Sequence, residues 1–255
     1  MSLLFISDLH ISGPEDPYYN ALLKVLQERP QSGDTVVLAG DVFDLFVGNK
    51  SVFKDRYSEF FEILRASIQK GVEFHYIEGN HDFLIEKAFE SIPQLKLHAT
   101  HTELNAGDKK FFVAHGDLVD RSDFGYLLLR RFFRSFVMKA FVTVIPGEWL
   151  DEFGKFSSKQ SRKRKPILPS EMPIQRMERL RRVYRSFAAE QLAKGFDFVV
   201  LGHCHDLDEM IFNIGGRCGQ YVNIGFPRNH GSFLSWTEGD EKIQREKLSV
   251  PDSAS

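Results

Sequence analysis

The chain has few of the features that mark secreted or membrane-spanning proteins. Its 255 residues include two cysteines, Cys204 and Cys218, which are too few for a disulfide framework and fit a reducing compartment. No uncharged apolar run approaches the roughly 20 residues that a transmembrane helix needs, and the best candidate, 132–145, is interrupted by Arg134 and Lys139. The first residues lack the basic segment of a signal peptide, and no repeat or low-complexity stretch is visible. We therefore expect a soluble, cytoplasmic protein.

Charge is distributed unevenly along the chain. The net charge is −2, but residues 120–194 carry +9 and the remainder carries −11. The same basic stretch holds eleven aromatic side chains. Such asymmetry predicts an anionic partner for the basic part.

The order of apolar runs predicts an α/β protein. Residues 1–118 alternate strand-like runs with segments of helical spacing, which we expect at Tyr18–Glu28 and Phe53–Lys70. This alternation favours helices packed outside a sheet. The composition changes at Val119, after which aromatic and basic residues occur together. Residues 120–172 are predicted to form a helical cap inserted into a core made of 1–119 and 173–255. After the cap we expect a long helix, followed by short strands; the predicted elements are Ile174–Lys194, Gln220–Ile224, Ser232–Trp236 and Lys242–Leu248.

Five strand-like runs each end in side chains that can bind metal ions. The carboxyl ends of strands are where ligands bind in open α/β sheets. The central one is the run Val36–Ala39, which is followed by Gly40 and Asp41. The other four runs end in Asp8-x-His10, Gly79-Asn80-His81-Asp82, His115-Gly116-Asp117 and Gly202-His203-Cys204-His205.

These residue types predict a site for two metal ions. Asp8 and His10 are two residues apart and point the same way while the strand persists. We expect them to hold one ion with His205, while Asn80, His115 and His203 hold the second and Asp41 bridges both. Mixed carboxylate, amide and imidazole ligands favour Mn²⁺, Fe or Zn²⁺. Two such ions, about 3.5–4 Å apart, can acidify a bridging water that attacks phosphorus in line.

Residues next to these ligands allow a functional and a structural interpretation. His81, oriented by a neighbouring carboxylate such as Asp82, would bind a phosphoryl oxygen or protonate the leaving group. A lone histidine is more often structural, and Asp44 and Asp117 would equally well cap the helices that follow their turns. Cys204 lies between two predicted ligands and is expected to point away from them as a buried thiol.

In their order and spacing, these motifs resemble the calcineurin-like metallophosphoesterase superfamily. The resemblance covers about residues 1–118 and 196–226 and implies a β-sandwich flanked by helices, with the ligand set given above. Within that superfamily the chain most resembles the UDP-2,3-diacylglucosamine hydrolases of bacterial lipid A synthesis. Agreement includes the Gly40-Asp41-x-Phe43 turn and the segment from Asp123 to Tyr126 after His115-Gly116-Asp117. Many members carry Arg where this chain has His81.

This second resemblance implies a substrate and further residues. The substrate would be a nucleotide-linked glycolipid whose pyrophosphate is hydrolysed, with Mn²⁺ the most expected metal and a metal-bridging hydroxide as nucleophile. Asp123, Tyr126 and Lys159 would contact it, and the enzyme would attach peripherally to the cytoplasmic face of the inner membrane, with no protein partner. Two alternatives remain. A nuclease or nucleotide phosphodiesterase would use the basic, aromatic cap to hold single-stranded nucleic acid, although a nucleic-acid partner is less expected. A non-enzymatic scaffold is disfavoured because all seven ligands are retained.

Overall fold

The computed structural model describes all residues except 49, 148, 150–151, 153–173 and 251–255. Its elements alternate as the sequence predicts. The strands are β1 (Ser2–Ile6), β2 (Thr35–Leu38), β3 (Phe46–Val47), β4 (Glu73–Ile77), β5 (Asp82–Phe83), β6 (Lys96–His98), β7 (His101–Ala106), β8 (Lys109–Ala114), β9 (Phe198–Leu201), β10 (Glu209–Ile214), β11 (Arg217–Asn223), β12 (Ser232–Thr237) and β13 (Gln244–Lys247). The helices are α1 (Pro17–Glu28), α2 (Ser51–Arg56), α3 (Ser58–Gln69), η1 (Glu86–Phe89), α4 (Phe124–Phe133), α5 (Phe136–Val144), α7 (Ile174–Ala193) and α8 (Pro227–His230).

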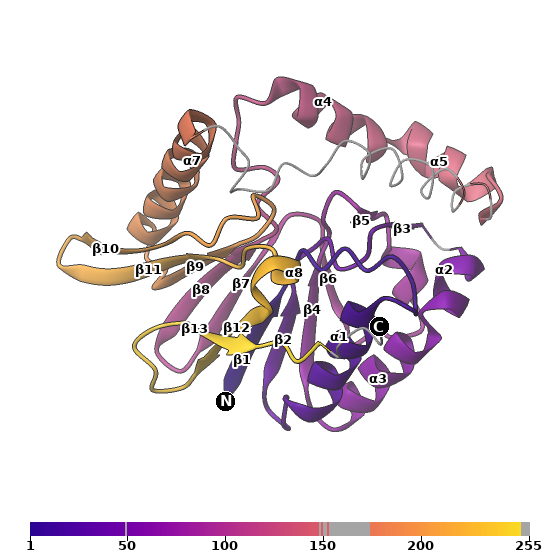
Figure 1. The fold of residues 1–255 in the computed structure, drawn as a ribbon, viewed down its shortest axis with the longest axis horizontal. Helices are drawn as coiled ribbons and strands as arrows, with labels where there is room; N and C mark the ends of the chain where they lie inside the picture. Colours follow the sequence, from indigo (N-terminus) through magenta and orange to yellow (C-terminus); the bar gives the residue numbers. More distant parts are fainter. Residues whose placement is uncertain (49, 148, 150–151, 153–173, 251–255) are drawn as a thin grey trace.

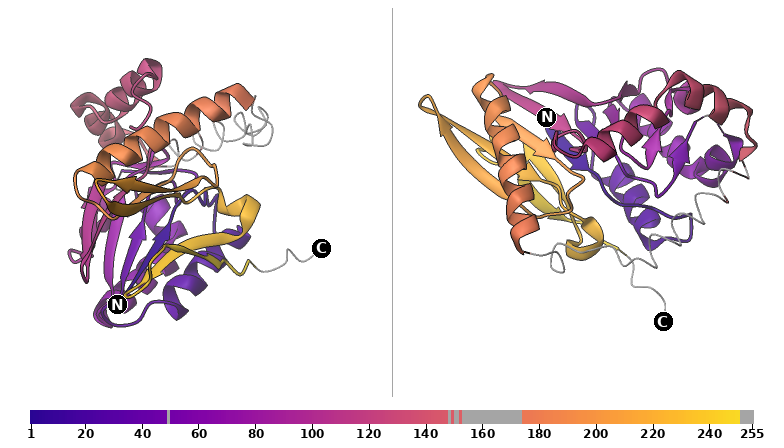
Figure 2. Two further views of the ribbon diagram at one scale, coloured as in Figure 1. Left: turned by 90° about the vertical axis from the view of Figure 1, so that its left-hand side faces the viewer. Right: turned by 90° about the horizontal axis from the view of Figure 1, so that it is seen from above.

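Two sheets packed face to face form the centre of the molecule. One has six strands in the order β13-β12-β1-β2-β4-β6, and the other has five in the order β10-β11-β9-β8-β7. Helices α1 and α3 cover the outer face of the first sheet, and α7 covers the outer face of the second (Figures 1 and 2). The predicted β-sandwich flanked by helices is therefore confirmed.

Burial on both faces explains why the strands read as continuous apolar runs. In β1, Leu3 and Phe5 point into the core between the sheets, whereas Leu4 and Ile6 point into the core beneath α1 and α3. The same alternation occurs in β2, β8 and β9. A strand buried on one face only would have alternated with polar residues.

Several predicted elements differ in detail. The helix expected at Phe53–Lys70 is two helices, α2 and α3, because Tyr57 leaves the helical region (φ −111°, ψ 30°). Helix α1 begins one residue earlier than predicted, at Pro17, where the Asp16 side chain caps it by accepting a hydrogen bond from the Tyr18 N–H. Strand β10, which pairs with β11 at the edge of its sheet, was not predicted.

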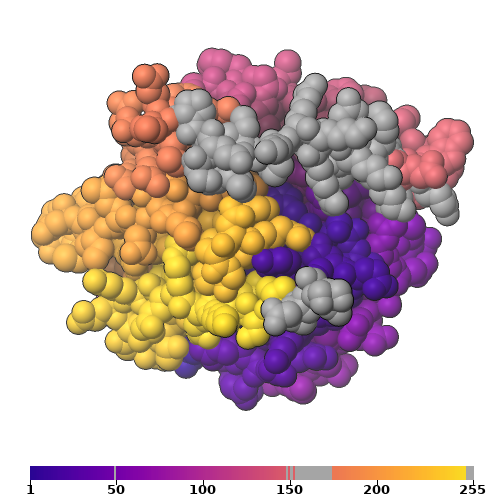
Figure 3. Space-filling model, viewed as in Figure 1, coloured from indigo at the N-terminus to yellow at the C-terminus, as the bar shows by residue number. Residues whose placement is uncertain are grey.

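Helices α4 and α5 lie across one edge of the sandwich, at the top of Figure 1. In the space-filling view, part of α4 is visible at the top of the molecule and part of α5 at its upper right (Figure 3). Helix α7 packs back on the core through Tyr184, Ala188 and Leu192, as expected. No helix among the described residues is long and apolar enough to cross a membrane. The cap boundary predicted at residue 172 lies outside the described residues.

Candidate metal centre

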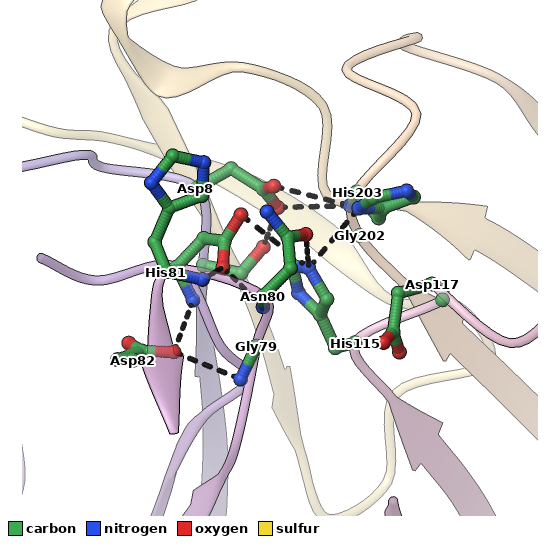
Figure 4. Close-up of polar contacts among 12 residues, drawn as sticks. Asp8, Gly79, Asn80, His81, Asp82, His115, Asp117, Gly202 and His203 are labelled. Atoms are coloured by element: carbon green, nitrogen blue, oxygen red, sulfur yellow. Dashed lines mark hydrogen bonds and ion pairs between the residues drawn. The ribbon is translucent and has the colours of Figure 1, made fainter. Parts of the chain in front are cut away.

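The five predicted loops converge at one edge of the sandwich. Strands β1, β2 and β4 run parallel in one sheet, and β8 and β9 run parallel in the other, so each group has its carboxyl ends on one side. Figure 4 shows the side chains from these ends pointing toward a common centre. Glycines allow the close approach: a Cβ on Gly79 would overlap the Asp41 carboxylate, and one on Gly202 would overlap that of Asp8.

Backbone strain in the described part of the chain is concentrated at this centre. Among the described residues, six that are not glycine have a positive φ. Five of these six are predicted ligands: Asp8, His10, Asp41, His203 and His205. Such conformations cost about 1–3 kcal/mol each and persist only where the surroundings enforce them. Their clustering therefore indicates a functional site rather than a packing accident.

Asp8, His10 and His205 form the first group of possible ligands. Nε2 of His205 lies 3.3 Å from Oδ1 of Asp8 and also 3.3 Å from Nε2 of His10. Asp8 is fully buried and accepts hydrogen bonds from the Ser7 hydroxyl and the His203 N–H. These contacts fix the carboxylate with one edge toward the histidines.

Asp41, His115 and His203 form the second group, with Asn80 beside it. Nε2 of His115 lies 3.5 Å from Oδ2 of Asp41, 3.2 Å from Nδ1 of His203 and 3.2 Å from Oδ1 of Asn80. Nδ1 of His115 is 3.0 Å from the Ala39 carbonyl and donates to it. Nε2 is therefore left with its lone pair toward the centre, as in a metal-binding histidine.

Asp41 lies between the two groups. Its Oδ2 is 3.8 Å from Nε2 of His10 as well as 3.5 Å from Nε2 of His115. Its Oδ1 accepts hydrogen bonds from the backbone N–H groups of Asn80 and His81 at 2.8 and 2.9 Å. The structure thus brings all seven predicted ligands together, with Asp41 in the middle.

The donor set fits two divalent cations. Bonds of about 2.0–2.2 Å to nitrogen and oxygen would place neighbouring ligand atoms about 3 Å apart, and the distances here are 3.2–3.8 Å. Electrostatics agree: burial alone would lower the pKa of His115, but Asp41 and Asp8 raise it to about 10. A buried site that favours positive charge this strongly suits metal ions.

His81 faces the first group. Its ring is 4.8 Å from that of His10, and its Nδ1 donates to the Asp44 carbonyl at 2.8 Å. Burial would lower the pKa of His81, but Asp41 and Asp44 raise it above its usual value. Its Nε2–H is left for a substrate, as a phosphate binder or proton donor requires.

The expectation that Asp82 orients His81 is wrong. Asp82 is fully buried and accepts hydrogen bonds from the N–H groups of Asp41, Val42 and Gly79 and from the Tyr76 hydroxyl. In Figure 4 its carboxylate and the His81 ring point to opposite sides of the loop. The carboxylate near His81 is that of Asp44, with Oδ1 3.8 Å from Nδ1.

The predicted substrate-binding residues lie beside the second group. Asp123 caps α4 by accepting a hydrogen bond from the Tyr126 N–H, and the Tyr126 ring is 5.8 Å from that of His203. Both residues line a cavity of about 260 Å³, whose lining also includes Asp120 and Arg176. Lys159 lies outside the described residues. Cys204 also lines this cavity and is partly rather than fully buried, with Sγ 3.1 Å from the Asn223 amide nitrogen.

Arginines that the motifs did not reveal hold the loops in place. Arg130 and the Tyr126 hydroxyl both donate to Oδ2 of Asp117, two residues after His115, and Arg134 donates to the Gly79 carbonyl at 2.7 Å. On the other side, Arg181 forms a two-point ion pair with Asp206, next to His205. In the sequence, only the surplus of basic residues in 120–194 pointed to these arginines.

Comparisons with known proteins agree with this geometry. The family model described as calcineurin-like phosphoesterase matches residues 1–207. A protein from Photobacterium profundum, named UDP-2,3-diacylglucosamine hydrolase, is 26% identical over 98% of each chain. Another of that name, from Neisseria gonorrhoeae, is 27% identical over 86% of this chain and 96% of its own.

Among solved structures, an archaeal phosphodiesterase covers 97% of this chain and 100% of its own at 12% identity, with a TM-score of 0.48. This similarity is too weak to inform function. The family match spans most of the chain, including every predicted ligand loop, and ends before strands β10 to β13. The chain is a metal-dependent hydrolase and belongs to the calcineurin-like phosphoesterase family.

Proposed function

We propose that this protein uses two divalent ions, Mn²⁺ foremost, to hydrolyse UDP-2,3-diacylglucosamine to UMP and 2,3-diacylglucosamine 1-phosphate. Asp8, His10 and His205 would hold one ion, Asn80, His115 and His203 the other, and Asp41 both. Bound ions would supply an activated water and stabilise charge on the phosphate. The names of the relatives support the substrate class.

The observation that carries the lipid part of the proposal is the orientation of α4. Three polar side chains of this segment face the core: Tyr126 and Arg130 bind Asp117, and Arg134, just after the helix, binds the Gly79 carbonyl. Phe133 packs inward against Phe83, but several other apolar side chains of α4 face outward, with Phe124 78% and Leu128 71% exposed. A surface helix of a globular protein normally shows the opposite arrangement.

Helix α5 extends this apolar surface. Phe136 and Val144 are 85% and 84% exposed, and the α4 residue Phe132 is 54% exposed. Contiguous exposed apolar side chains next to an active centre mark a binding site for apolar ligands. Acyl chains fit this surface, and each buried CH₂ contributes about 0.8 kcal/mol of binding free energy.

The same surface supports attachment to a membrane. Basic residues on α4 and α5 include Arg131 and Lys139, and exposed apolar side chains accompany them. Cationic residues around an apolar face favour peripheral binding to anionic lipid. We therefore propose that the protein works in the cytoplasm, on the inner-membrane surface.

In the chemical step, this chain's own residues bind and protonate. His81 is fixed through Nδ1 on the Asp44 carbonyl. Asp41 and Asp44 raise the pKa of His81 above its usual value against the effect of burial, which favours the protonated ring. It would hold a phosphoryl oxygen or protonate the leaving group.

A nucleic-acid substrate has less support. The cavity beside His203 is lined by three carboxylates, Asp117, Asp120 and Asp123, and one arginine, Arg176; Arg130 and Arg179 form ion pairs with Asp117 and Asp120 and are therefore already engaged. Affinity for nucleic acid comes mainly from cationic contacts to phosphates. Carboxylates there suit sugar hydroxyls or ring N–H groups better than a phosphodiester backbone.

The test is a side-by-side assay with Mn²⁺ on three substrates: UDP-2,3-diacylglucosamine, UDP-N-acetylglucosamine and an oligonucleotide. We expect the acylated substrate to react fastest, with detergent or lipid changing the rate. The double variant Leu128→Ser with Phe132→Ser should raise KM for that substrate alone. Ile211→Ser on β10 removes a side chain of similar exposure, 52% against 54% for Phe132, far from α4, and should have no effect. Equal rates on both nucleotide sugars would rule out the lipid substrate.

A further inference from the structure

Arg228 of α8 reaches across the fold to the first ligand loop, from more than 200 positions later in the sequence. Its Nε donates to the Leu9 carbonyl at 2.6 Å, and its Nη2 donates to the His10 carbonyl at 3.0 Å. The same Nη2 also binds the Asp16 carboxylate. The guanidinium lies 4.6 Å from the centre of the Tyr18 ring, and the Tyr18 hydroxyl donates to the Arg228 carbonyl.

The loop that Arg228 binds is strained. Asp8 and His10 have φ values of 54° and 46°, in the left-handed region that side chains disfavour. One edge of the loop is held by backbone bonds, from Asp8 N to the Gly40 carbonyl and from His10 N to the Asp41 carbonyl. The opposite edge presents the carbonyls of Leu9 and His10. Arg228 is the group that binds both of them.

The segment that carries Arg228 also contacts the ligand rings. The Phe226 ring stacks on that of His205, with centroids 4.5 Å apart and an angle of 12°. It meets the His10 ring edge-on at 5.9 Å. Arg228 therefore holds the backbone of His10, and Phe226 packs against the rings of His205 and His10. No comparable contact from this segment to Asn80, His115 or His203 occurs among the described residues.

We propose that Arg228 is a positioning residue that sets the affinity of one metal position, the one held by Asp8, His10 and His205. This inference rests on the proposed two-metal function. Without the guanidinium, the His10 carbonyl loses its partner and the strained loop relaxes, so Asp8 and His10 no longer converge on His205. The ion held by Asn80, His115 and His203 should be little affected.

A purely structural role for Arg228 is the competing explanation, because its partner Asp16 caps α1. A structural residue would lower global stability and leave the two metal affinities unchanged relative to each other. Arg29 provides a matched control. It forms a two-point ion pair with Glu246 that bridges equally distant parts of the chain, away from the metal centre.

The experiment is a Mn²⁺ titration of the full chain, with free Mn²⁺ measured by electron paramagnetic resonance. Wild-type protein should bind two ions. Loss of a group that orients metal ligands typically costs 10–100-fold in affinity, so Arg228→Gln should weaken one site by about 10–100-fold and leave the other within about twofold. Arg29→Gln should change neither, and Asn80→Ala should weaken the other site.

Arg228→Lys keeps the charge but lacks the planar fork that contacts several acceptors at once, so we expect an intermediate loss of Mn²⁺ affinity at the same site. If Arg228→Gln does not fold, Arg228→Lys tests the proposal in its place. Unchanged or equally weakened sites in the variant would overturn the role of Arg228. Wild-type protein that binds fewer than two ions would instead overturn the proposed function.

Discussion

Replacing Asp82 with asparagine separates a supporting role from a catalytic one. Oδ1 of Asp82 accepts from Asp41 N and Gly79 N at 2.9 and 2.8 Å, and Oδ2 accepts from Val42 N and the Tyr76 hydroxyl at 2.9 and 2.6 Å. Asparagine has one oxygen, so its NH₂ group must face one of these pairs. The Tyr76 hydroxyl can rotate and accept from that NH₂, but the Val42 N–H cannot.

The expected cost follows from that one buried donor. An unsatisfied buried N–H costs about 1–3 kcal/mol, and each kcal/mol lowers the melting temperature by about 2–4 °C in a chain of this size. Asp82→Asn should therefore lower the free energy of unfolding by about 1–3 kcal/mol. Urea denaturation measures this directly. Asp108→Asn, at a carboxylate that is 84% exposed, is the control and should leave the free energy of unfolding unchanged.

The alternative has a different signature. If Asp82 acted through His81, the asparagine variant would lose turnover by about the factor expected for a general acid or base, 10²–10⁴, at unchanged stability. That combination would refute the supporting role. Reduced stability with turnover reduced far less than in a His81 variant would confirm it.

Three other changes test the centre and its surroundings. His81→Ala should lower turnover by about 10²–10⁴-fold with both Mn²⁺ ions retained, and normal turnover would leave His81 a surface histidine. Asp41→Ala should remove at least one ion and nearly all activity, and metal analysis showing two ions would contradict the bridging role. In β6, which pairs with β4, burial and then the charge of His75 lower the pKa of His98 to about 4, so the unfolded chain takes up a proton on this residue first as the pH falls. The contribution of neutral His98 to stability is therefore complete above pH 6.5 and declines as the pH falls toward 4. His98→Gln should flatten this decline when urea midpoints are measured against pH. An unchanged slope would show that His98 does not cause the decline.

The sequence predicted the central strands and the ligand loops because their signals are local. Runs such as Phe198–Leu201 are apolar at every position, since both faces of the central strands are covered, and a polar motif follows each run at once. Strand β10 was missed because it lies at a sheet edge and exposes Met210 and Ile211. The break at Tyr57 has no glycine or proline to announce it.

Roles that depend on direction or on distant contacts escaped prediction. His81 and Asp82 are neighbours in sequence, but successive side chains of an extended segment point to opposite sides, so proximity was misleading. Arg228 and Phe226 lie in no motif, and their partners Leu9 and His10 are more than 200 positions away. A single sequence without contact information cannot reveal such pairings.

The position of β1 between β2 and β12 has a consequence for how the protein is made. One neighbour, β2, follows β1 closely in the sequence, whereas the other, β12, is translated more than 200 residues after β1. His203, His205 and Arg228 follow equally late, so a growing chain can assemble Asp41, Asn80 and His115 but neither complete ligand group. Long-range pairing of this kind slows folding. Nascent chains of this protein should therefore acquire a full complement of metal only after their C-terminal strands have left the ribosome.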